Sequence, residues 1–179
     1  IMIQFIPIRT NHTSYPFVEQ LMLDSFPLTE RRTEKDQREV TDNEPRFKCM
    51  LITDGTLEIG LITLWQFPDF TYIEHLATSP SVRNQGCGKQ IMHKLRETVP
   101  GLLLLEVELP EEELSRRRIG FYERCGFTLH PYEYLQPPYH AEGEPFPLRI
   151  MTSGTNSFTQ EDFQKCRELI YRHVYKYIP

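Results

Sequence analysis

The chain has 179 residues, a length that favours one domain around one hydrophobic core. Hydrophobic residues make up 39% and charged residues 25%, which excludes an intrinsically disordered chain. The 20 Lys and Arg residues are outnumbered by 25 Asp and Glu residues, so the formal net charge is −5. Because no overall basic field draws the chain to polyanions, we expect neither nucleic acid nor a membrane as a partner.

The sequence carries no membrane, secretory or metal-binding signal. No apolar run approaches the ~20 residues of a membrane span, and the N-terminus lacks the cationic start and cleavage site of a secretory signal. A cytoplasmic protein is therefore expected. The six His residues form no H-E-x-x-H, and the cysteines form no C-x-x-C pair. We expect no metal, and four reduced thiols at Cys49, Cys87, Cys125 and Cys166.

The first forty residues predict a strand, a helix and a polar segment. Alternating apolar residues predict a strand over 3–8, and apolar residues at helical spacing predict a helix over 18–26. Pro27 ends that helix. The stretch 28–43 is almost wholly polar, so it forms either a solvated helix or a loop over a site.

A hairpin signal follows. Asp54-Gly55 stands between the apolar runs 47–53 and 57–67, and both turn residues tolerate a positive φ. The sequence therefore predicts two antiparallel strands, with a further strand over 72–78.

The remaining sequence alternates strands and helices. Its expected elements are a glycine loop at 83–89, a helix ending before Pro100, a buried strand over 102–109, a helix over 112–125 capped by Gly126, strands over 127–135 and 148–152, a proline-rich loop at 136–147, a linker over 153–158 and an amphipathic helix over 159–177. Helical spacing places on the inner face of the 112–125 helix Leu114, Phe121, Tyr122 and Cys125.

The glycine loop predicts a phosphate site. Gly86-x-Gly88 between a strand and a helix gathers unpaired backbone N–H groups and the positive end of a helix dipole. Four cations surround it in sequence, namely Arg83, Lys89, Lys94 and Arg96. The dinucleotide fingerprint fails because its third glycine is Ile91 here, and the Walker loop fails on spacing. A turn without any ligand remains an alternative.

Two motifs at the right separation resemble the GNAT superfamily of acyl-CoA-dependent N-acyltransferases. The first is Arg83-x-x-Gly86-x-Gly88 after a short strand, and the second is Phe121-Tyr122-Glu123-x-x-Gly126-Phe127 about 35 residues later. The resemblance implies an α/β (α+β) fold with a mixed, mostly antiparallel central sheet that is flanked by helices and splayed near Leu76. It implies an N-acetyltransferase domain over 1–152. Residues 153–179, a linker and an extra C-terminal amphipathic helix packed on the same domain, lie outside the usual core.

The resemblance also implies acetyl-CoA as a co-substrate and a set of residues that bind it. Those that would cradle the pyrophosphate are Arg83, Asn84, Gln85, Gly86, Gly88 and Lys89. The backbone of Leu76 and Thr78 would bind the pantetheine arm and the thioester carbonyl. The chain departs from the family pattern at two positions before the tyrosine. The family often has an Asn and an Ala there, and this chain has Ser115 and Arg118.

The implied activity is transfer of an acetyl group from acetyl-CoA to a primary amine by direct attack in a ternary complex. The acceptor is a small-molecule or peptide amine, and a homodimer is one open oligomeric state. A non-catalytic acyl-CoA-binding or sensing module is the alternative, and a nicotinamide reductase is disfavoured by Ile91. Arg31 and Arg32 are candidates for binding a carboxylate or phosphate of the acceptor, although a polar segment of both signs is more often a solvated surface. The 136–147 loop either forms a wall of the acceptor cleft or is a rigid connector.

Glu74 is the candidate base. An amine with a pKa near 10.4 is only about one part in a thousand neutral at pH 7.4, so something must accept its proton. On a strand Glu74 shares a face with Leu76, about 7 Å away, and reaches an incoming amine directly or through water. A solvated or salt-bridged carboxylate is the other interpretation. His75 faces the opposite side, where a packed core histidine is expected.

Tyr122 is the candidate acid that protonates the departing thiolate, a role that the resemblance implies. The alternative is an ordinary aromatic residue on the inner face of a helix. Cys87 lies in the glycine loop at a helix N-terminus, and we interpret it as a filler residue in preference to a covalent acyl-cysteine.

Overall fold

A computed structural model describes residues 1–178 of the chain. By its internal contacts the chain forms two compact units. The first unit consists of Ile1–Gln66 and Ile73–Val99, and the second of Phe67–Tyr72 and Pro100–Pro179. The division falls within one strand, since the first residues of the 71–78 strand belong to the second unit.

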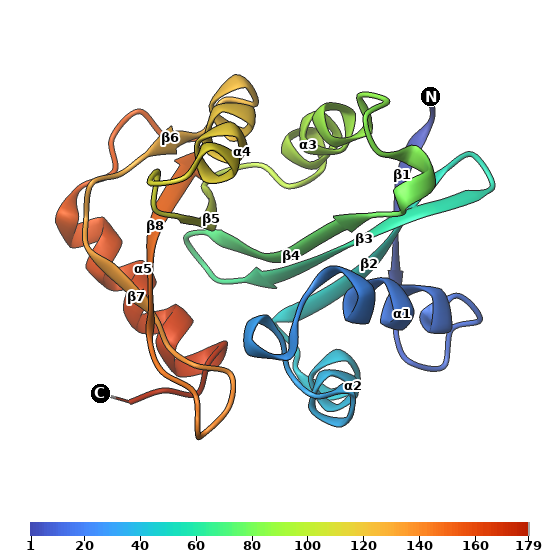
Figure 1. The fold of residues 1–179 in the computed structure, drawn as a ribbon, viewed down its shortest axis with the longest axis horizontal. Coiled ribbons are helices and arrows are strands. Elements are labelled where there is room, and N and C mark those ends of the chain that lie inside the picture. The colour runs from blue at the N-terminus through green and yellow to red at the C-terminus, as the bar shows by residue number, and fades with distance from the viewer. Residues whose placement is uncertain (179) are drawn as a thin grey trace. The chain divides into compact units, whose positions relative to one another are not determined.

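The first unit is a sheet covered by helices on both sides. In chain order it contains β1 (Ile3–Ile8), α1 (Tyr15–Ser25), the 3-10 turn η1 (Leu28–Glu30), α2 (Glu34–Asn43), β2 (Phe47–Asp54), β3 (Leu57–Gln66), most of β4 (Thr71–Thr78), η2 (Pro80–Val82) and α3 (Cys87–Thr98). The strand order is β1-β2-β3-β4, and β1 and β3 each pair antiparallel with β2. Helices α1 and α2 lie on one side of the sheet and α3 on the other (Figure 1).

The predicted hairpin is present, shifted by one residue. Asp54 still pairs with Leu57, so the two loop residues are Gly55 and Thr56. Gly55 has a φ of +61°, the left-handed conformation that glycine adopts without steric cost. The Asp54 carboxylate instead accepts a hydrogen bond from the backbone N–H of Met2 at 2.8 Å.

The polar segment 28–43 contains a helix. Thr33 caps α2, because its hydroxyl accepts a hydrogen bond from the N–H of Asp36 at 3.2 Å. Only one narrow face of α2 is buried, that of Gln37, Val40 and Thr41. The solvated-helix alternative is therefore correct for most of this segment.

Strands β3 and β4 approach each other closely near the end of β4. A Cβ on Gly60 would lie 2.5 Å from the carbonyl oxygen of Ala77, so only glycine fits there. The N–H of Ser79 donates to the carbonyl of Ile59 at 2.7 Å. Most of β3 is fully buried because helices cover both faces of the sheet.

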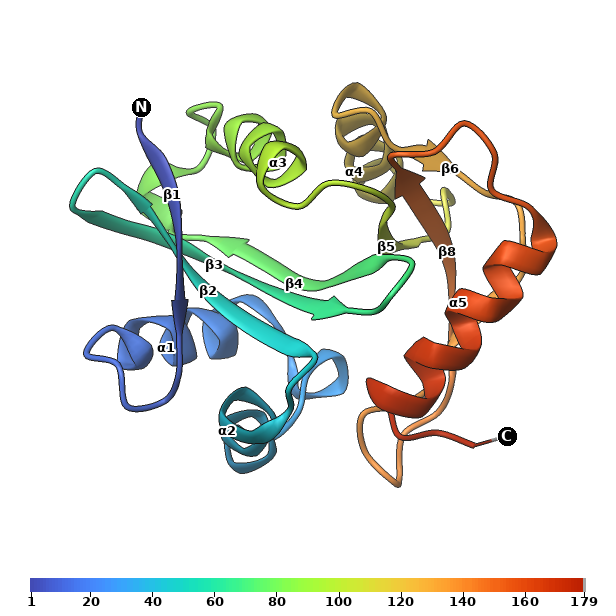
Figure 2. The same ribbon diagram turned by 180° about the vertical axis from the view of Figure 1, so that it is seen from behind.

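The second unit is a smaller antiparallel sheet with two helices. It contains β5 (Leu103–Glu108), α4 (Glu113–Arg124), β6 (Thr128–Leu129), β7 (Tyr134–Gln136), β8 (Phe146–Ser153) and α5 (Gln160–His173). Strand β8 pairs with β5 on one side and with both β6 and β7 on the other. Helices α4 and α5 lie on opposite sides of β8 in both ribbon views (Figures 1 and 2).

The single strand expected over 127–135 is wrong. It is broken into β6 and β7, because two additional residues are inserted after His130. The N–H of His130 still donates to the carbonyl of Ile150 at 3.0 Å, but Tyr134 already pairs with Leu148. Pro131 follows His130 and has no N–H to continue the ladder.

The expected inner face of the 112–125 helix is partly wrong. Leu114 is 66% exposed, whereas Ser115, Ile119 and Cys125 are buried. The buried positions follow the helical period from Ser115 onward, and this period also directs Tyr122 inward. Gly126 ends the helix with a φ of +93°, as predicted.

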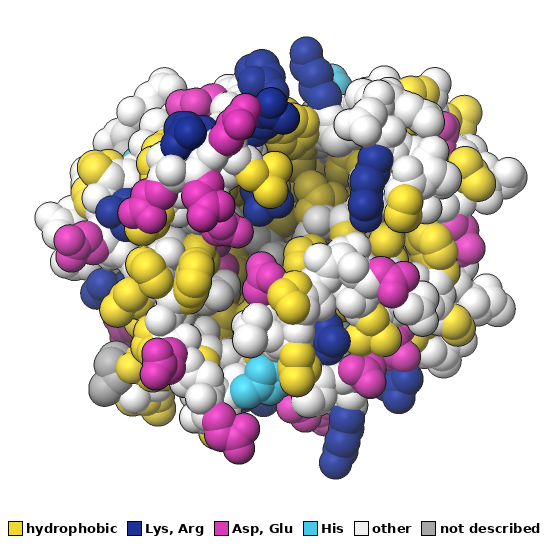
Figure 3. Space-filling view, in the orientation of Figure 1, with side chains coloured by type: hydrophobic (Ala, Val, Ile, Leu, Met, Phe, Trp, Pro, Cys, Tyr) yellow, Lys and Arg dark blue, Asp and Glu magenta, His cyan; other side chains and the backbone are white. Residues whose placement is uncertain are grey.

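The fold class predicted from the sequence is confirmed: the chain is α/β, with mostly antiparallel strands flanked by five helices. No helix within residues 1–178 is long and apolar enough to cross a membrane. On the face drawn in Figure 3, Lys and Arg side chains are interspersed with Asp and Glu. The proposal of one acetyltransferase domain over 1–152 with 153–179 packed on it stays a prediction.

Candidate active site

Strand β4 exposes one of its two faces. His75 and Ala77 are buried, whereas Glu74, Leu76 and Thr78 are partly exposed. The alternation follows the two-residue period of a strand. It places the predicted base on the same face as the two residues expected to bind the pantetheine arm.

The carboxylate of Glu74 is held inside the first unit. Its side chain is 0% exposed, so the exposed part of Glu74 is its backbone. Arg32 forms an ion pair with one carboxylate oxygen at 3.0 Å, and the indole N–H of Trp65 donates to the other at 2.8 Å. The salt-bridged interpretation of Glu74 therefore describes its state in this structure.

Arg32 and Arg31 have protein partners. Arg32 is only 8% exposed, donates to the amide oxygen of Gln37 at 3.2 Å and stacks over the Trp65 ring at 5.8 Å. Arg31 donates to the carbonyl of Phe26 at 2.9 Å. The observed role of Arg32 is to fix Glu74, while acceptor binding by either arginine stays a prediction.

His75 is packed in the core, as predicted. It is 4% exposed, and its Nε2 lies 2.8 Å from the carbonyl oxygen of Glu30. Its ring meets the Phe26 ring edge-on, with 4.6 Å between centroids. Burial lowers the pKa of His75, so the neutral imidazole is favoured.

The glycine loop is exposed and lies at an uncapped helix N-terminus. Residues 83–86 are exposed, and α3 begins directly after them. Gly86 is the N-cap residue with a φ of +78°, and Asn84 also has a positive φ, of +64°. No side chain caps α3 and its first turn contains no acid, so its N–H groups remain available for an anion.

The space beside Gly86 is open. A Cβ at Gly86 would meet no atom within 4 Å. Arg83 and Gln85 brace the loop through backbone carbonyls, because Arg83 donates to Thr78 at 3.2 Å and Gln85 donates to Ser81 at 3.1 Å. The loop conformation is thus supported by its own side chains while its outer surface stays open.

The cluster of four cations expected around the loop is smaller than predicted. Arg83 and Lys89 flank the N-terminus of α3. Arg96 is ten residues beyond Gly86, which is about 15 Å along a helix, and belongs to the last turn. Lys94 is eight residues beyond it, so neither of these two cations stands at the loop.

Cys87 is the first residue of α3 and is buried, with 6% of its surface exposed. The thiol therefore packs inward while the loop residues before it face outward. This placement supports the filler interpretation.

Tyr122 is fixed by aromatic neighbours and keeps a hydroxyl without a partner. Its ring meets Phe121 and Phe127 edge-on, with centroids 5.3 and 5.7 Å away. No group of residues 1–178 forms a hydrogen bond with its hydroxyl. Burial raises the pKa of Tyr122, while the positive charge of Arg118 opposes the rise. The phenol is therefore protonated at neutral pH.

The predicted site residues are divided between the two units. Tyr122 belongs to the second unit, whereas Glu74, Leu76, Thr78 and the loop residues belong to the first. Their meeting at one thioester stays a prediction.

Sequence reasoning missed Glu106. It lies on β5, where it is one carboxylate within an apolar run, and three tyrosine hydroxyls donate to it. The available signal was its place between Leu105 and Val107, since an acid flanked by apolar residues in a strand expected to be buried on both faces needs partners.

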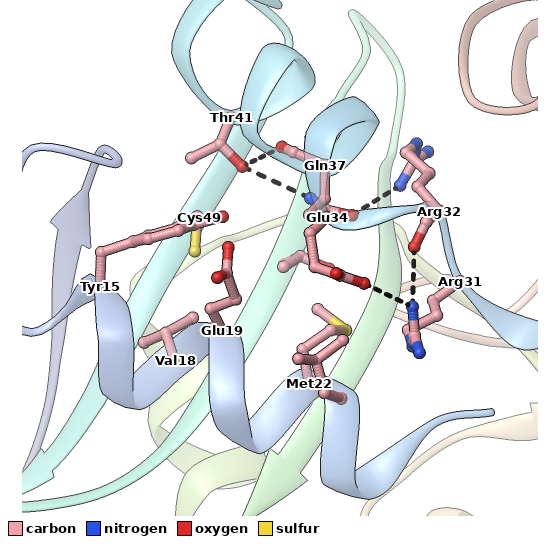
Figure 4. A pocket seen from close by; sticks show the side chains of 12 residues that line it. Tyr15, Val18, Glu19, Met22, Arg31, Arg32, Glu34, Gln37, Thr41 and Cys49 are labelled. Carbon is pink, nitrogen blue, oxygen red and sulfur yellow. Dashed lines mark hydrogen bonds and ion pairs between the residues drawn. The ribbon is translucent and has the colours of Figure 1, made fainter. Parts of the chain in front are cut away.

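A small pocket lies in the first unit between α1, α2 and the sheet. Tyr15, Val18 and Met22 of α1 line it together with Gln37 and Cys49 (Figure 4). The space that it encloses is ≈ 20 Å³, room for about one or two water molecules. Ligand sites are usually of several hundred Å³, so the space enclosed here is too small for a whole acceptor molecule.

The described residues hold no group of three or more His, Cys, Asp or Glu side chains that could bind a metal ion. None of the four cysteines forms a disulfide, and all four are buried.

Comparison with known proteins defines the family. Residues 45–129 match the family model described as an acetyltransferase (GNAT) domain. A solved structure from Bacteroides thetaiotaomicron, assigned to the GNAT acetyltransferases, is 40% identical, with a TM-score of 0.93 over 96% of this chain and 98% of that chain. The chain belongs to the GNAT family. It is an acyl-CoA-dependent acetyltransferase.

More distant structures share the fold. An aminoglycoside 6'-N-acetyltransferase complexed with coenzyme A is 17% identical, with a TM-score of 0.64 over 86% of this chain and 96% of that chain. A spermidine N-acetyltransferase chimera from Vibrio cholerae and hSSAT is 12% identical, with a TM-score of 0.63 over 86% and 95%. No curated protein matches the sequence significantly.

Proposed function

We propose that the protein transfers an acetyl group from acetyl-CoA to a primary amine by direct attack in a ternary complex. The observation that carries this proposal is the Tyr122 hydroxyl, whose ring packs against Phe121 and Phe127 but which has no hydrogen-bond partner among residues 1–178. A donor without a structural role suits an acid that protonates a leaving group. The sensing alternative offers no use for such a group.

The open N-terminus of α3 supports a pyrophosphate site. Its backbone N–H groups and those of the preceding loop would hold the diphosphate, with cations at both ends of the loop. The binding set is Arg83, Asn84, Gln85, Gly86, Gly88 and Lys89. The backbone of Leu76 and Thr78, two partly exposed residues of β4, would hold the pantetheine arm and the thioester carbonyl.

The acceptor must lose a proton before or during its attack. The amine nitrogen forms a bond to the thioester carbon, and its proton passes to Glu74, through water because the carboxylate itself is covered. Arg32 holds the Glu74 carboxylate in an ion pair and Trp65 donates a hydrogen bond to it, so the side chain stays on this face of the strand. The carbon–sulfur bond then breaks, and the coenzyme A thiolate takes a proton from Tyr122. Tyr122 regains a proton from solvent and Glu74 releases its own to solvent, which restores the enzyme.

A panel of amines tests the proposal by free thiol release from acetyl-CoA. Polyamines, aminoglycosides, amino acids and short peptides should include at least one acceptor that raises thiol release well above hydrolysis. Tight binding of acetyl-CoA with the same thiol release for every amine would favour the sensing module. Tighter binding of NADH than of coenzyme A would favour a reductase.

Glu74→Gln is expected to lower the rate about tenfold at pH 7, with recovery at higher pH as more of the amine is already neutral. The substitution also leaves the buried Arg32 without its charged partner, so the free energy of unfolding should fall by roughly 2 kcal/mol or more. The pH–rate profile and a denaturant titration separate the two effects.

Trp65→Phe is the matched control for this substitution. It removes one hydrogen bond to Glu74 but leaves the carboxylate and Arg32 in place. Stability should fall while the shape of the pH–rate profile is unchanged. If Glu74→Gln shows a constant loss from pH 7 to pH 9.5, Glu74 has only a structural role.

A further inference from the structure

Two residues of α4 share one carboxylate of β5. The Ser115 hydroxyl donates to one oxygen of Glu108 at 3.3 Å, and the Arg118 guanidinium forms an ion pair with the other oxygen at 3.7 Å. Ser115 is buried, whereas the side chains of Arg118 and Glu108 are about half exposed. All three residues belong to the second unit, and we name them the Glu108 anchor.

The Glu108 anchor joins the two positions at which the chain departs from the family pattern. These positions are Ser115 and Arg118, and both contact the same carboxylate. An exposed ion pair contributes little to the stability of a protein. Stability therefore gives little reason for a charged side chain at position 118.

Arg118 precedes Tyr122 by one helical turn. Residues four positions apart on a helix lie on the same face, with about 5–6 Å between their Cβ atoms. Both residues lie within α4, so this spacing applies to them. The Glu108 anchor therefore keeps a permanent positive charge on the face of the helix that carries Tyr122.

The charge of Arg118 acts on the ionisation of Tyr122. Burial raises the pKa of Tyr122, and the positive charge of Arg118 lowers it. Cys125 of the same helix raises the pKa of Tyr122, and Glu108 faces Arg118 from β5. The aromatic rings that pack on Tyr122 are uncharged. The guanidinium is thus a group that favours the phenolate form of a tyrosine whose surroundings oppose that form.

We propose that Arg118 is a positioning residue that stabilises the phenolate left when Tyr122 protonates the coenzyme A thiolate. The inference rests on the proposed function, in which Tyr122 is the acid. In that step the O–H bond of Tyr122 breaks, an S–H bond forms, and the negative charge passes from the sulfur to the phenol oxygen. The guanidinium lowers the free energy of that charge until the phenolate regains a proton from solvent.

A titration of the tyrosinate absorbance in the near ultraviolet tests the coupling without an acceptor. The difference between each protein and the same protein with Tyr122→Phe isolates the signal of Tyr122 from those of the other tyrosines. Arg118→Met keeps most of the side-chain volume and removes the charge, so the acid dissociation constant of Tyr122 should fall about fivefold. Arg118→Lys keeps the charge and should restore most of the parent value.

Arg117→Met is the matched control. Arg117 lies on the same helix and forms an ion pair of its own, with Glu113 at 2.9 Å. Because it is five positions before Tyr122, it lies on a different face of the helix. Its substitution should leave both the Tyr122 titration and kcat within about 1.5-fold of the parent. Circular dichroism and acetyl-CoA binding show whether each variant is folded.

A double-mutant cycle tests the role of Arg118 in turnover, with the most active amine of the panel as the acceptor. Arg118→Met should lower kcat about threefold, less than it lowers the acidity of Tyr122, and leave the KM for acetyl-CoA within about twofold. In the Tyr122→Phe background the same substitution should leave kcat unchanged, because the group on which Arg118 acts is absent. Arg118→Lys should restore most of kcat.

The outcomes separate this inference from the proposed function. An unshifted Tyr122 titration in folded Arg118→Met, an equal shift in Arg117→Met, or a loss of kcat that persists in the Tyr122→Phe background would each overturn the role of Arg118. A shifted titration together with no amine-dependent thiol release would support the coupling of Arg118 to Tyr122 and contradict the transfer reaction.

Discussion

Replacing Tyr122 by Phe is expected to lower kcat about a hundredfold and to leave the affinity for acetyl-CoA within about twofold. Phe keeps the ring and its edge-on contacts with Phe121 and Phe127. The lost hydroxyl has no hydrogen-bond partner among residues 1–178, so the free energy of unfolding should change by less than about 0.5 kcal/mol. Steady-state kinetics, acetyl-CoA titration and denaturant unfolding measure the three quantities.

Tyr132→Phe is the matched control for this loss of a hydroxyl. The Tyr132 hydroxyl donates to the carbonyl of Phe158 at 2.9 Å, so its removal should cost roughly 1 kcal/mol of stability and leave kcat unchanged. Tyr122→Phe should therefore lose kcat and keep its stability, whereas Tyr132→Phe should lose stability and keep its kcat. Full activity of Tyr122→Phe on the true acceptor would make Tyr122 a packing residue, with the thiolate leaving unassisted or protonated by water.

Replacing Gly86 by Val is expected to weaken acetyl-CoA binding by on the order of five- to 150-fold. The φ of +78° at Gly86 is costly for a β-branched residue, and the new side chain enters the open space beside the helix N-terminus. Because no protein atom lies within 4 Å of the added Cβ, the loss arises from backbone strain and from the ligand, not from a clash inside the protein.

Gly55→Val is the control for the strain alone. Gly55 has a φ of +61° and, like Gly86, nothing within 4 Å of its Cβ, but it lies in the β2–β3 hairpin loop. Both variants should lose a similar amount of stability, and only Gly86→Val should lose acetyl-CoA affinity. If calorimetry gives the same acetyl-CoA affinity for Gly86→Val and Gly55→Val, the glycine loop does not bind the cofactor.

Local sequence patterns predicted most turns and helix ends, because these features depend on a few neighbouring residues. The hairpin at Gly55, the helix cap at Gly126 and the exposed glycine loop each depend on a few neighbouring residues. The break between β6 and β7 was not visible, because the two extra residues after His130 are defined only by pairing with β8. A strand's partner, and not its own periodicity, reveals a bulge.

Candidate site residues could be named from the sequence where a motif marks them and not where distant residues meet. The glycine loop and Tyr122 are candidates because of their motifs, and their roles stay predictions. Arg32 and Glu74 are 42 positions apart, and Tyr175 and Glu106 are 69 positions apart, so no spacing rule connects them. A buried charge is expected to have hydrogen-bond or ion-pair partners, because burial without them is costly. Which residues are those partners is seen only in the folded structure.

The burial of the cysteines has a practical consequence for measuring this protein. Burial raises the pKa of both Cys49 and Cys166 to about 12, so at pH 7.4 only a few in roughly 100,000 of these side chains are thiolates. A disulfide reagent such as Ellman's reagent attacks thiolates, and coenzyme A is a small, freely accessible thiol. In the folded enzyme the colour that develops therefore reports mainly product. A slow additional colour that increases with heating or urea comes from unfolded molecules, each of which exposes four thiols. The same assay therefore measures both turnover and unfolding.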